Sequence, residues 1–68
     1  MGSSFWVNIG WIFLIEGKLI VEAKAVYDIN NFHMAQVLSY LKTFDKKLGL
    51  ILNFSKAKLQ IKRVVFNL

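Results

Sequence analysis

One segment with helical periodicity lies between two pairs of strand-like segments, and this order limits the folds open to the chain. Between residues 31 and 44, apolar side chains recur at intervals of three and four, as on a helix that packs against a sheet. They are Met34, Val37, Leu38, Leu41 and Phe44. The polar residues from 28 to 31 supply candidates for the N-cap. A helix between two strands is normally a right-handed crossover, so the strands on either side are expected to pair in parallel.

The four flanking segments are short, apolar and separated by turn signals. Residues 5–15 are rich in aromatic and β-branched side chains, and they end at Glu16-Gly17, after which residues 18–26 read as an antiparallel partner. The apolar run of residues 48–54 is expected to form a central strand covered on both faces, followed by a last strand at 59–66. The prediction is a small α/β domain, α+β-like, with the order β-β-α-β-β. Its four-stranded mixed sheet keeps the chain order, with the first and last strands at the edges and the helix on one face.

The chain is short and unusually apolar, which predicts a partner. It has 68 residues, enough for a single domain over 1–68, and 56% of them are hydrophobic, with a mean hydropathy of +0.46. A chain of this size buries only about 60% of the surface that its unfolded form exposes. Because one helix covers one face of a sheet, the other face is expected to contact a second copy, another protein or a missing piece of the same domain.

The composition favours the cytoplasm over a membrane or an oxidising compartment. The chain has no cysteine, so no disulfide supports it. As a helix, the apolar run at 5–15 would span roughly 16 Å, against about 30 Å for a bilayer core. The run also lacks the basic start and the cleavage site of a signal peptide. It is therefore interpreted as a buried strand, and no membrane partner is expected.

Positive charge is concentrated in the second half of the chain. From residue 42 onward Asp45 is the single acidic residue, against the basic residues Lys42, Lys46, Lys47, Lys56, Lys58, Lys62 and Arg63. Such a half can attract the phosphates of a nucleic acid. Lysines that keep an apolar domain soluble explain the same pattern. Both interpretations stay open from charge alone.

Two charged residues interrupt the apolar segment at 18–26. Glu22 and Lys24 are two residues apart, so a strand projects both from the same face. A buried charge is costly unless it is paired or bound to a metal. Either the two residues form a salt bridge, or Glu22 binds a metal while Lys24 lies beside a water or a phosphate.

A second stripe on the expected helix consists of His33, Gln36 and Tyr40, at positions i, i+3 and i+7. A polar flank, with Tyr40 packed at the margin of the core, accounts for this spacing as well as a site does. A lone histidine does not make a metal site.

The residues around these two patterns are more specific. The strings I-V-E-A-K-A-V, H-M-A-Q-V-L-S-Y-L-K, L-G-L-I-L-N-F and I-K-R-V-V occur in this order. Together they resemble the C-terminal half of the GxxExxR protein family, within the PD-(D/E)XK nuclease superfamily, over about residues 13–65. The resemblance implies a restriction-endonuclease-like core that uses Mg²⁺. It implies that Glu22 and Lys24 are the catalytic Glu-x-Lys, with Glu22 binding the metal. Gln36 and Tyr40 match a Gln-x-x-x-Tyr pattern that borders the active site and helps to place DNA.

The chain departs from this family in two ways. The family has an aspartate at the position of Ile12, whereas residues 5–15 contain no Asp or Glu, and Asn8 is their only conventional polar residue. If the pairing of the first two strands were shifted by one residue, Trp11 would lie opposite Glu22 instead, and an acid would still be missing there. One carboxylate makes an incomplete Mg²⁺ site, and loss of a ligand is expected to cost at least about 10–100-fold in affinity or activity. The helix that carries Gly-x-x-Glu-x-x-Arg also has no counterpart in residues 1–10, so the core is expected to be truncated.

These observations favour a degenerate nuclease-like domain that is catalytically inactive and binds nucleic acid weakly. Two alternatives stay open. The chain is an active Mg²⁺-dependent nuclease if a partner chain, or Glu16 in the turn, supplies the second acid. It is a non-enzymatic oligomeric interaction module if its uncovered sheet face binds other copies and no nucleic acid. Whether the chain is an enzyme is therefore left undecided by the sequence.

Overall fold

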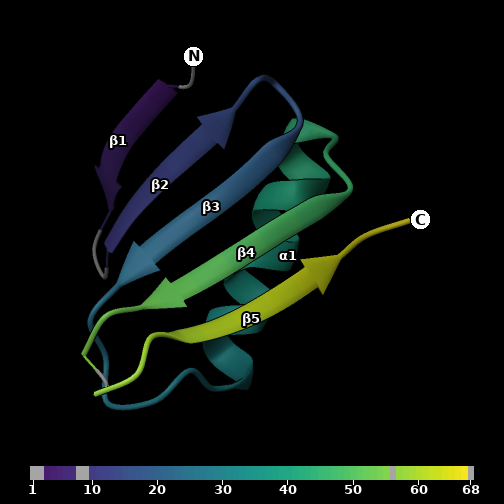
Figure 1. Cartoon of the computed structure of the whole chain (residues 1–68). Coiled ribbons are helices and arrows are strands. Elements are labelled where there is room, and N and C mark those ends of the chain that lie inside the picture. The colour runs from purple at the N-terminus through teal and green to yellow at the C-terminus, as the bar shows by residue number, and fades with distance from the viewer. Residues whose placement is uncertain (1–2, 8–9, 56, 68) are drawn as a thin grey trace.

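The computed structural model describes residues 3–7, 10–55 and 57–67, the first of these ranges as backbone alone. Five strands form one sheet in the order β1-β2-β3-β4-β5, and one helix lies against one of its faces (Figure 1). The elements are β1 (Ser3–Val7), β2 (Gly10–Ile15), β3 (Leu19–Lys24), α1 (Asn31–Phe44), β4 (Leu48–Asn53) and β5 (Gln60–Val65). Strands β3 and β4 are parallel, and all other neighbours are antiparallel.

The predicted element order is confirmed, and one strand is added. The helix bounds agree with the prediction, and the parallel pair flanks the helix as expected. The predicted strand at 5–15 is instead two strands, because the chain reverses direction between Val7 and Gly10, which pair with each other. A side chain at Gly10 would collide with the carbonyl of Ala23, so glycine allows β2 to approach β3 there. The strand directly before β3 was expected to lie at an edge of the sheet. This prediction is wrong, because β1 pairs with the outer edge of β2.

The core lies between α1 and every second residue of the strands beneath it. Its buried apolar side chains are Ile12, Ile20, Ile29, Val37, Leu41, Ile51 and Val64. A Cβ added at Gly49 would lie 2.7 Å from Cγ1 of Val37. The missing side chain of Gly49 therefore lets α1 pack closely against β4.

Two predictions about burial are wrong. The strand at 48–54 was expected to be covered on both faces, but its residues alternate between buried and half-buried. Leu48, Leu50 and Leu52 are the half-buried ones, because α1 covers the opposite face only. Phe44 was expected in the apolar stripe of the helix, but it is 45% exposed. It is the last helical residue before the left-handed C-cap at Asp45, where the chain turns away.

A buried asparagine ties the loops at one end of the sheet together. Asn53 is 0% exposed. Its Oδ1 accepts from the amide of Val26 at 3.0 Å, and its Nδ2 donates to the carbonyl of Val26 and to Oε1 of Gln60, both at 2.9 Å. Nε2 of Gln60 in turn donates to Oδ1 of Asp28 at 2.7 Å. One side chain thus holds the β3–α1 loop against the β4–β5 connection.

Helix α1 has complementary caps at its two ends. At the N-terminus, Oδ1 of Asn30 accepts from the amide of His33, and Nδ1 of His33 accepts from the amide of Asn30, both at 3.1 Å. At the C-terminus, the amide of Lys46 donates to the carbonyl of Leu41 at 2.8 Å. Within the part of the chain that the structure describes, no helix is long and apolar enough to cross a membrane.

Candidate functional site

Glu22 and Lys24 form a buried ion pair on β3. Nζ of Lys24 lies 3.2 Å from Oε2 of Glu22, and both side chains are 0% exposed. The alternation of β3 points both toward α1, so the prediction that they share one face is confirmed. The pair therefore lies inside the protein, in the layer between helix and sheet.

The neighbours of Glu22 across the sheet are both isoleucines. Glu22 pairs with Ile12 on β2 and with Ile51 on β4. Ile12 itself is 2% exposed. The register is the one expected, with Ile12 rather than Trp11 opposite Glu22, since Trp11 pairs with Ala23. No second acid lies beside Glu22 in these pairs.

Burial dominates the electrostatics of Glu22. Desolvation raises the pKa of its carboxyl above 4.5, and the charge and hydrogen bond of Lys24 oppose that rise only in part. Apart from their mutual contact, neither the oxygens of Glu22 nor Nζ of Lys24 has a hydrogen-bond partner among the described residues. The two groups therefore compensate mainly each other.

Two side chains of α1 interact electrostatically with this pair, and a third lies between them along the helix. Burial, and then the negative charge of Glu22, raise the pKa of Tyr40, so the phenol is within electrostatic reach of the carboxylate. Burial, and then the positive charge of Lys24, lower the pKa of His33. Oε1 of Gln36 is buried without a hydrogen-bond partner among the described residues. The structure thus brings Tyr40 near Glu22 and His33 near Lys24, and Gln36 lies between these two residues on α1.

His33 has a structural partner on its own helix. Its Nδ1 accepts from the amide of Asn30, so in the neutral ring the proton is on Nε2. Capping therefore uses the one available lone pair of the neutral ring, so none is left to bind a metal while the cap is formed. The sequence analysis assigned His33 to the polar stripe of the helix and did not predict this capping role. The one sign of it in the sequence is that His33 follows the N-cap residue Asn30 by three positions.

The residues around Glu22 do not fit a magnesium ion. Mg²⁺ prefers several oxygen ligands in an octahedron. Among the described residues, no three of His, Cys, Asp and Glu come together as such a group. Glu16, the other acid considered in the sequence, lies in the β2–β3 turn with φ 53°. It is at least about 10 Å along the strand from Glu22.

The basic residues expected to bind nucleic acid do not form one surface. Three lie in the last turn of α1 and the α1–β4 loop, one in the β4–β5 connection at the opposite end of the sheet, and two on opposite faces of β5. In that order they are Lys42, Lys46 and Lys47, then Lys58, then Lys62 and Arg63, while Lys56 lies outside the described residues.

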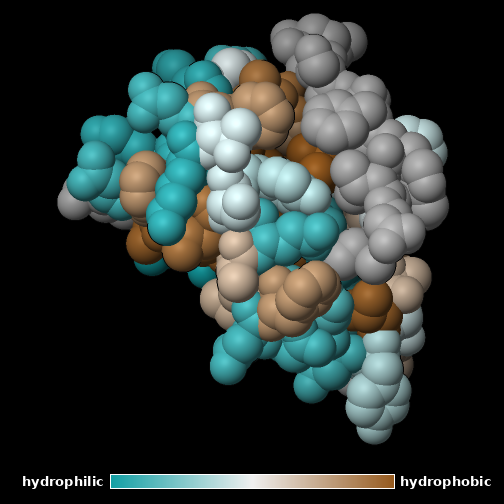
Figure 2. Space-filling model, turned by 180° about the vertical axis from the view of Figure 1, so that it is seen from behind, coloured by the Kyte–Doolittle hydropathy of each residue, from teal (hydrophilic) through white to brown (hydrophobic). Residues whose placement is uncertain are grey.

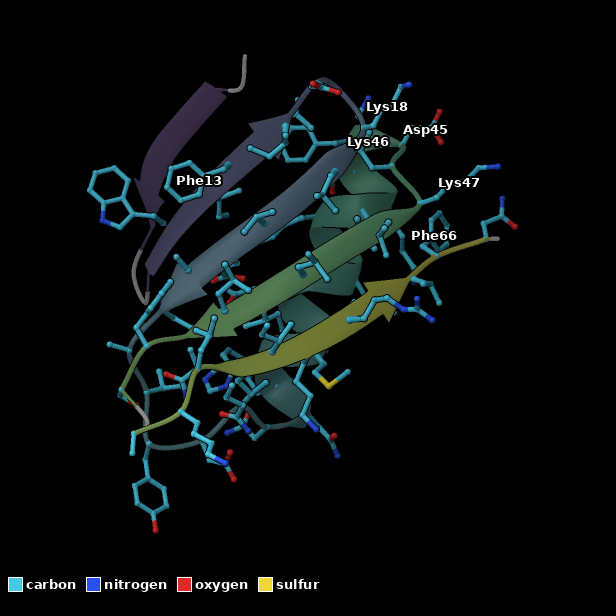
Figure 3. All side chains as sticks on the ribbon, viewed as in Figure 1. Phe13, Lys18, Asp45, Lys46, Lys47 and Phe66 are labelled. Carbon is cyan, nitrogen blue, oxygen red and sulfur yellow. The ribbon has the colours of Figure 1, made fainter. Side chains whose placement is uncertain are left out.

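One group of lysines surrounds a hollow. A cavity of about 250 Å³ between the β2–β3 turn and the α1–β4 loop is lined by Gly17, Lys18, Asp45, Lys46 and Lys47. Figure 3 shows these lysines at the same end of the sheet, and hydrophilic residues gather there at the upper left of Figure 2. None of the three lysines forms an ion pair with another described residue. The cavity can therefore receive an anion.

Lys18 was missed in the sequence because it is far from the other basic residues along the chain. The parallel pair explains how it joins them. Leu19 pairs with Leu48, so the residues that precede these two strands, Lys18 and Lys47, emerge side by side. The parallel pairing expected from the crossover already implied that Lys18 and Lys47 are neighbours in space.

A comparison with protein families identifies one match. A model described as the PD-(D/E)XK nuclease superfamily matches residues 8–64. No curated protein gives a significant match, and no solved structure does.

Proposed function

Because the chain belongs to the PD-(D/E)XK nuclease superfamily, we propose that it is a catalytically inactive nuclease-like domain that binds nucleic acid weakly. Within the superfamily, the strings over residues 13–65 favour the GxxExxR type. The observation that carries the proposal is the pairing of Ile12 with Glu22, at the position where the family has an aspartate. This isoleucine is also part of the buried core, so its position offers no ligand atom to an ion.

The chemistry of phosphodiester hydrolysis supports inactivity. A bound Mg²⁺ activates a water and offsets the charge of the phosphate, and it needs accessible carboxylates that are ionised. Here the single carboxylate has a raised pKa and 0% exposure, and its neighbour Lys24 pairs with it. Neither group can touch a phosphate without a rearrangement of the core. Gln36 and Tyr40 would border a site whose set of metal ligands is incomplete among the described residues.

Nucleic-acid binding is supported at a different place. Lys18, Lys46 and Lys47 present ammonium groups without an ion-pair partner among the described residues, where β3 and β4 begin. Lys42 lies in the preceding turn of α1, with its Nζ 5.8 Å from the ring centroid of Phe66. Glu22 is four residues further along β3 than Lys18, or about 13 Å. Contacts to phosphates by a few lysines give weak, salt-dependent binding without sequence preference. Asp45 in the same cavity reduces the attraction further.

Plasmid nicking tests the absence of cleavage. Purified protein with Mg²⁺ is expected to leave supercoiled plasmid intact. Magnesium-dependent nicking that disappears in Glu22→Ala would show that the domain is an active nuclease.

Thermal denaturation tests whether the missing acid explains the missing metal site. Ile12→Asp introduces a carboxylate opposite Glu22, so Mg²⁺ is expected to raise the melting temperature of this variant and not that of the wild type. Trp11→Asp is the matched control, because residue 11 points to the other face of the sheet. An equal response of both variants would contradict this account of the defect.

Fluorescence anisotropy with a labelled DNA duplex tests the binding surface. Binding is expected at low salt, and Lys46→Glu with Lys47→Glu should reduce the slope of log K against log salt by about two. Lys58→Glu, at the other end of the sheet, is the control and should change the affinity less. No binding of the wild type at low salt would refute this part of the proposal.

The non-enzymatic interaction module stays as a second candidate function. It is favoured by the apolar face of the sheet that α1 does not cover.

A further inference from the structure

The sheet face opposite α1 is almost entirely apolar. The register of the strands arranges its side chains in three rows across β2, β3, β4 and β5. The rows are Trp11, Ala23, Leu52 and Ile61; Phe13, Val21, Leu50 and Arg63; and Ile15, Leu19, Leu48 and Val65. We call these twelve residues the open face. Figures 1 and 3 show this face toward the viewer, with α1 behind the sheet.

We propose that a second copy of the chain covers the open face, so that two sheets pack face to face. The proposal does not depend on the nuclease-like function; it names the partner for the face on which the second candidate function rests. At the margins of the open face, Trp11 is 47%, Ile61 55% and Val65 43% exposed. Sheets that pack face to face align their strands within about 30° and lie about 10 Å apart. The twofold axis of the dimer runs parallel to the strands, between β3 and β4.

Arg63, the one charged residue of the open face, selects this axis. An axis parallel to the strands lays β5 of one copy over β2 of the other, and Arg63 then faces Phe13 of the second copy. A guanidinium group stacks favourably on an aromatic ring. An axis perpendicular to the strands would instead lay β5 over β5 and bring the two Arg63 side chains together. Like charges in an apolar interface are strongly unfavourable.

The sizes of the other side chains fit the same arrangement. With the axis between β3 and β4, Ala23 faces Leu52 of the second copy, and Trp11 faces Ile61. A small residue opposite a large one lets the two layers interdigitate. Pairing through the free edge of β5 is a poorer alternative, because Lys62 and Arg63 lie in the middle of that strand, and charges on an edge strand oppose further pairing.

The size of the open face predicts a weak dimer. Each side chain occupies about 4.8 Å between strands and about 6.8 Å along a strand, so the twelve cover a footprint of about 400 Å² in each copy. A dimer then covers about 800 Å² in footprint, which is below the roughly 1,000 Å² expected of a stable specific interface and within the size range of weak, transient ones. The dimer is therefore expected to dissociate on dilution.

Sedimentation equilibrium tests whether the open face forms the dimer. The wild type is expected to rise from the monomer mass of 7.9 kDa toward twice that value as concentration increases. Leu50→Asp, in the middle of the open face, should stay at 7.9 kDa. Thr43→Asp, on the exposed side of α1, adds the same charge and should dimerise as the wild type does. Circular dichroism establishes that each variant is folded. A wild type that stays monomeric at every concentration, or a folded Leu50→Asp that still dimerises, overturns the proposal.

Charge substitution tests the axis. Phe13→Glu should keep the dimer, because residue 13 then faces Arg63 of the second copy. Adding Arg63→Glu places like charges opposite each other, and the dimer should be lost. If Phe13→Glu alone abolishes the dimer while Arg63→Glu alone does not, the proposed axis is wrong. Neither substitution touches the lysines around the cavity, so a failure here leaves the DNA-binding proposal unaffected.

Discussion

At the scale of single residues, the decisive feature is that Glu22 and Lys24 compensate each other inside the core. In a nuclease, such a pair must reach a metal and a phosphate. Here both side chains are 0% exposed, with isoleucines on both neighbouring strands. Buried ion pairs of this kind contribute little net stability, because the cost of desolvation offsets their attraction. The loss of one partner, in contrast, leaves an uncompensated charge.

Removal of Lys24 alone should therefore destabilise the protein strongly. Lys24→Met is expected to lower the free energy of unfolding by about 3–5 kcal/mol, because Glu22 is left without its partner. Adding Glu22→Leu should restore stability to the wild-type value or above it. Urea denaturation of the two variants measures the difference. A double variant no more stable than Lys24→Met would show that the pair has a further role.

The same pair makes a prediction about pH. Because burial raises the pKa of Glu22 above 4.5, the folded state holds this proton more tightly than the unfolded chain does. The contribution of Glu22 to stability is full below pH 4.5 and falls as pH rises toward the raised pKa. Lys24→Met removes the opposing charge, so the pKa of Glu22 should rise further and the fall should extend to higher pH. Denaturation curves on both sides of pH 4.5 would reveal the slope, which should vanish when Glu22→Leu is added.

His33 should produce the opposite slope. Its pKa is lowered from 6.5, so the unfolded chain takes up a proton first as pH falls. The stability that is present above pH 6.5 is then lost below it, and protonated Nδ1 can no longer accept from the amide of Asn30. Glutamine at this position keeps the capping bond without titrating, so His33→Gln should remove the loss. The test is the difference in unfolding free energy between this variant and the wild type across pH 6.5, and a constant difference would contradict the prediction.

At the scale of secondary-structure elements, the parallel pair of β3 and β4 organises both ends of the molecule. At one end it brings Lys18 and Lys47 together, and at the other it brings Lys24 beside Asn53. The crossover through α1 could be predicted because its periodicity is regular and strand crossovers have a fixed hand. The hairpin of β1 and β2 could not, because Asn8 and Gly10, both turn-forming residues, lie within an apolar run that resembles one strand.

Asn53 should be the polar side chain on which the loops at that end depend. Asn53→Ala leaves the amide of Val26 without its partner, while the carbonyl of Val26 keeps the hydroxyl of Ser55 as a donor. An unpaired buried group costs about 1–3 kcal/mol. Asn53→Asp keeps the acceptor but places a buried carboxylate oxygen against the carbonyl of Val26 and Oε1 of Gln60, so it should destabilise the loops at least as much. Hydrogen exchange at the amide of Val26 is the measurement. Exchange in Asn53→Ala as slow as in the wild type would mean that other contacts hold the loop.

At the scale of the whole molecule, the fold has one covered face and one open face. A chain of 68 residues buries too little surface to be very stable alone, and the twelve side chains of the open face are outside its core. A second copy would complete the missing layer of the sheet. The two activities that we propose, binding of nucleic acid and dimerisation, then use different surfaces.

Dimerisation should couple to thermal stability. Because a ligand that binds only the folded state raises stability by mass action, the melting temperature of the wild type should increase with protein concentration. Leu50→Asp should melt at a temperature that does not depend on concentration. Differential scanning calorimetry over a dilution series makes the comparison, and a concentration-independent wild type would contradict the coupling.

The amino-acid sequence by itself determined the order of the elements, the helix from 31 to 44, the common face of Glu22 and Lys24, and the absence of an acid near Ile12. These follow from local periodicity and residue type, which do not depend on distant contacts. Only the tertiary structure decided the rest. It sealed the ion pair from solvent, assigned Nδ1 of His33 to a helix cap, added β1, and separated the basic residues into distinct groups. Each of these results depends on which segments, distant in the sequence, pack against one another.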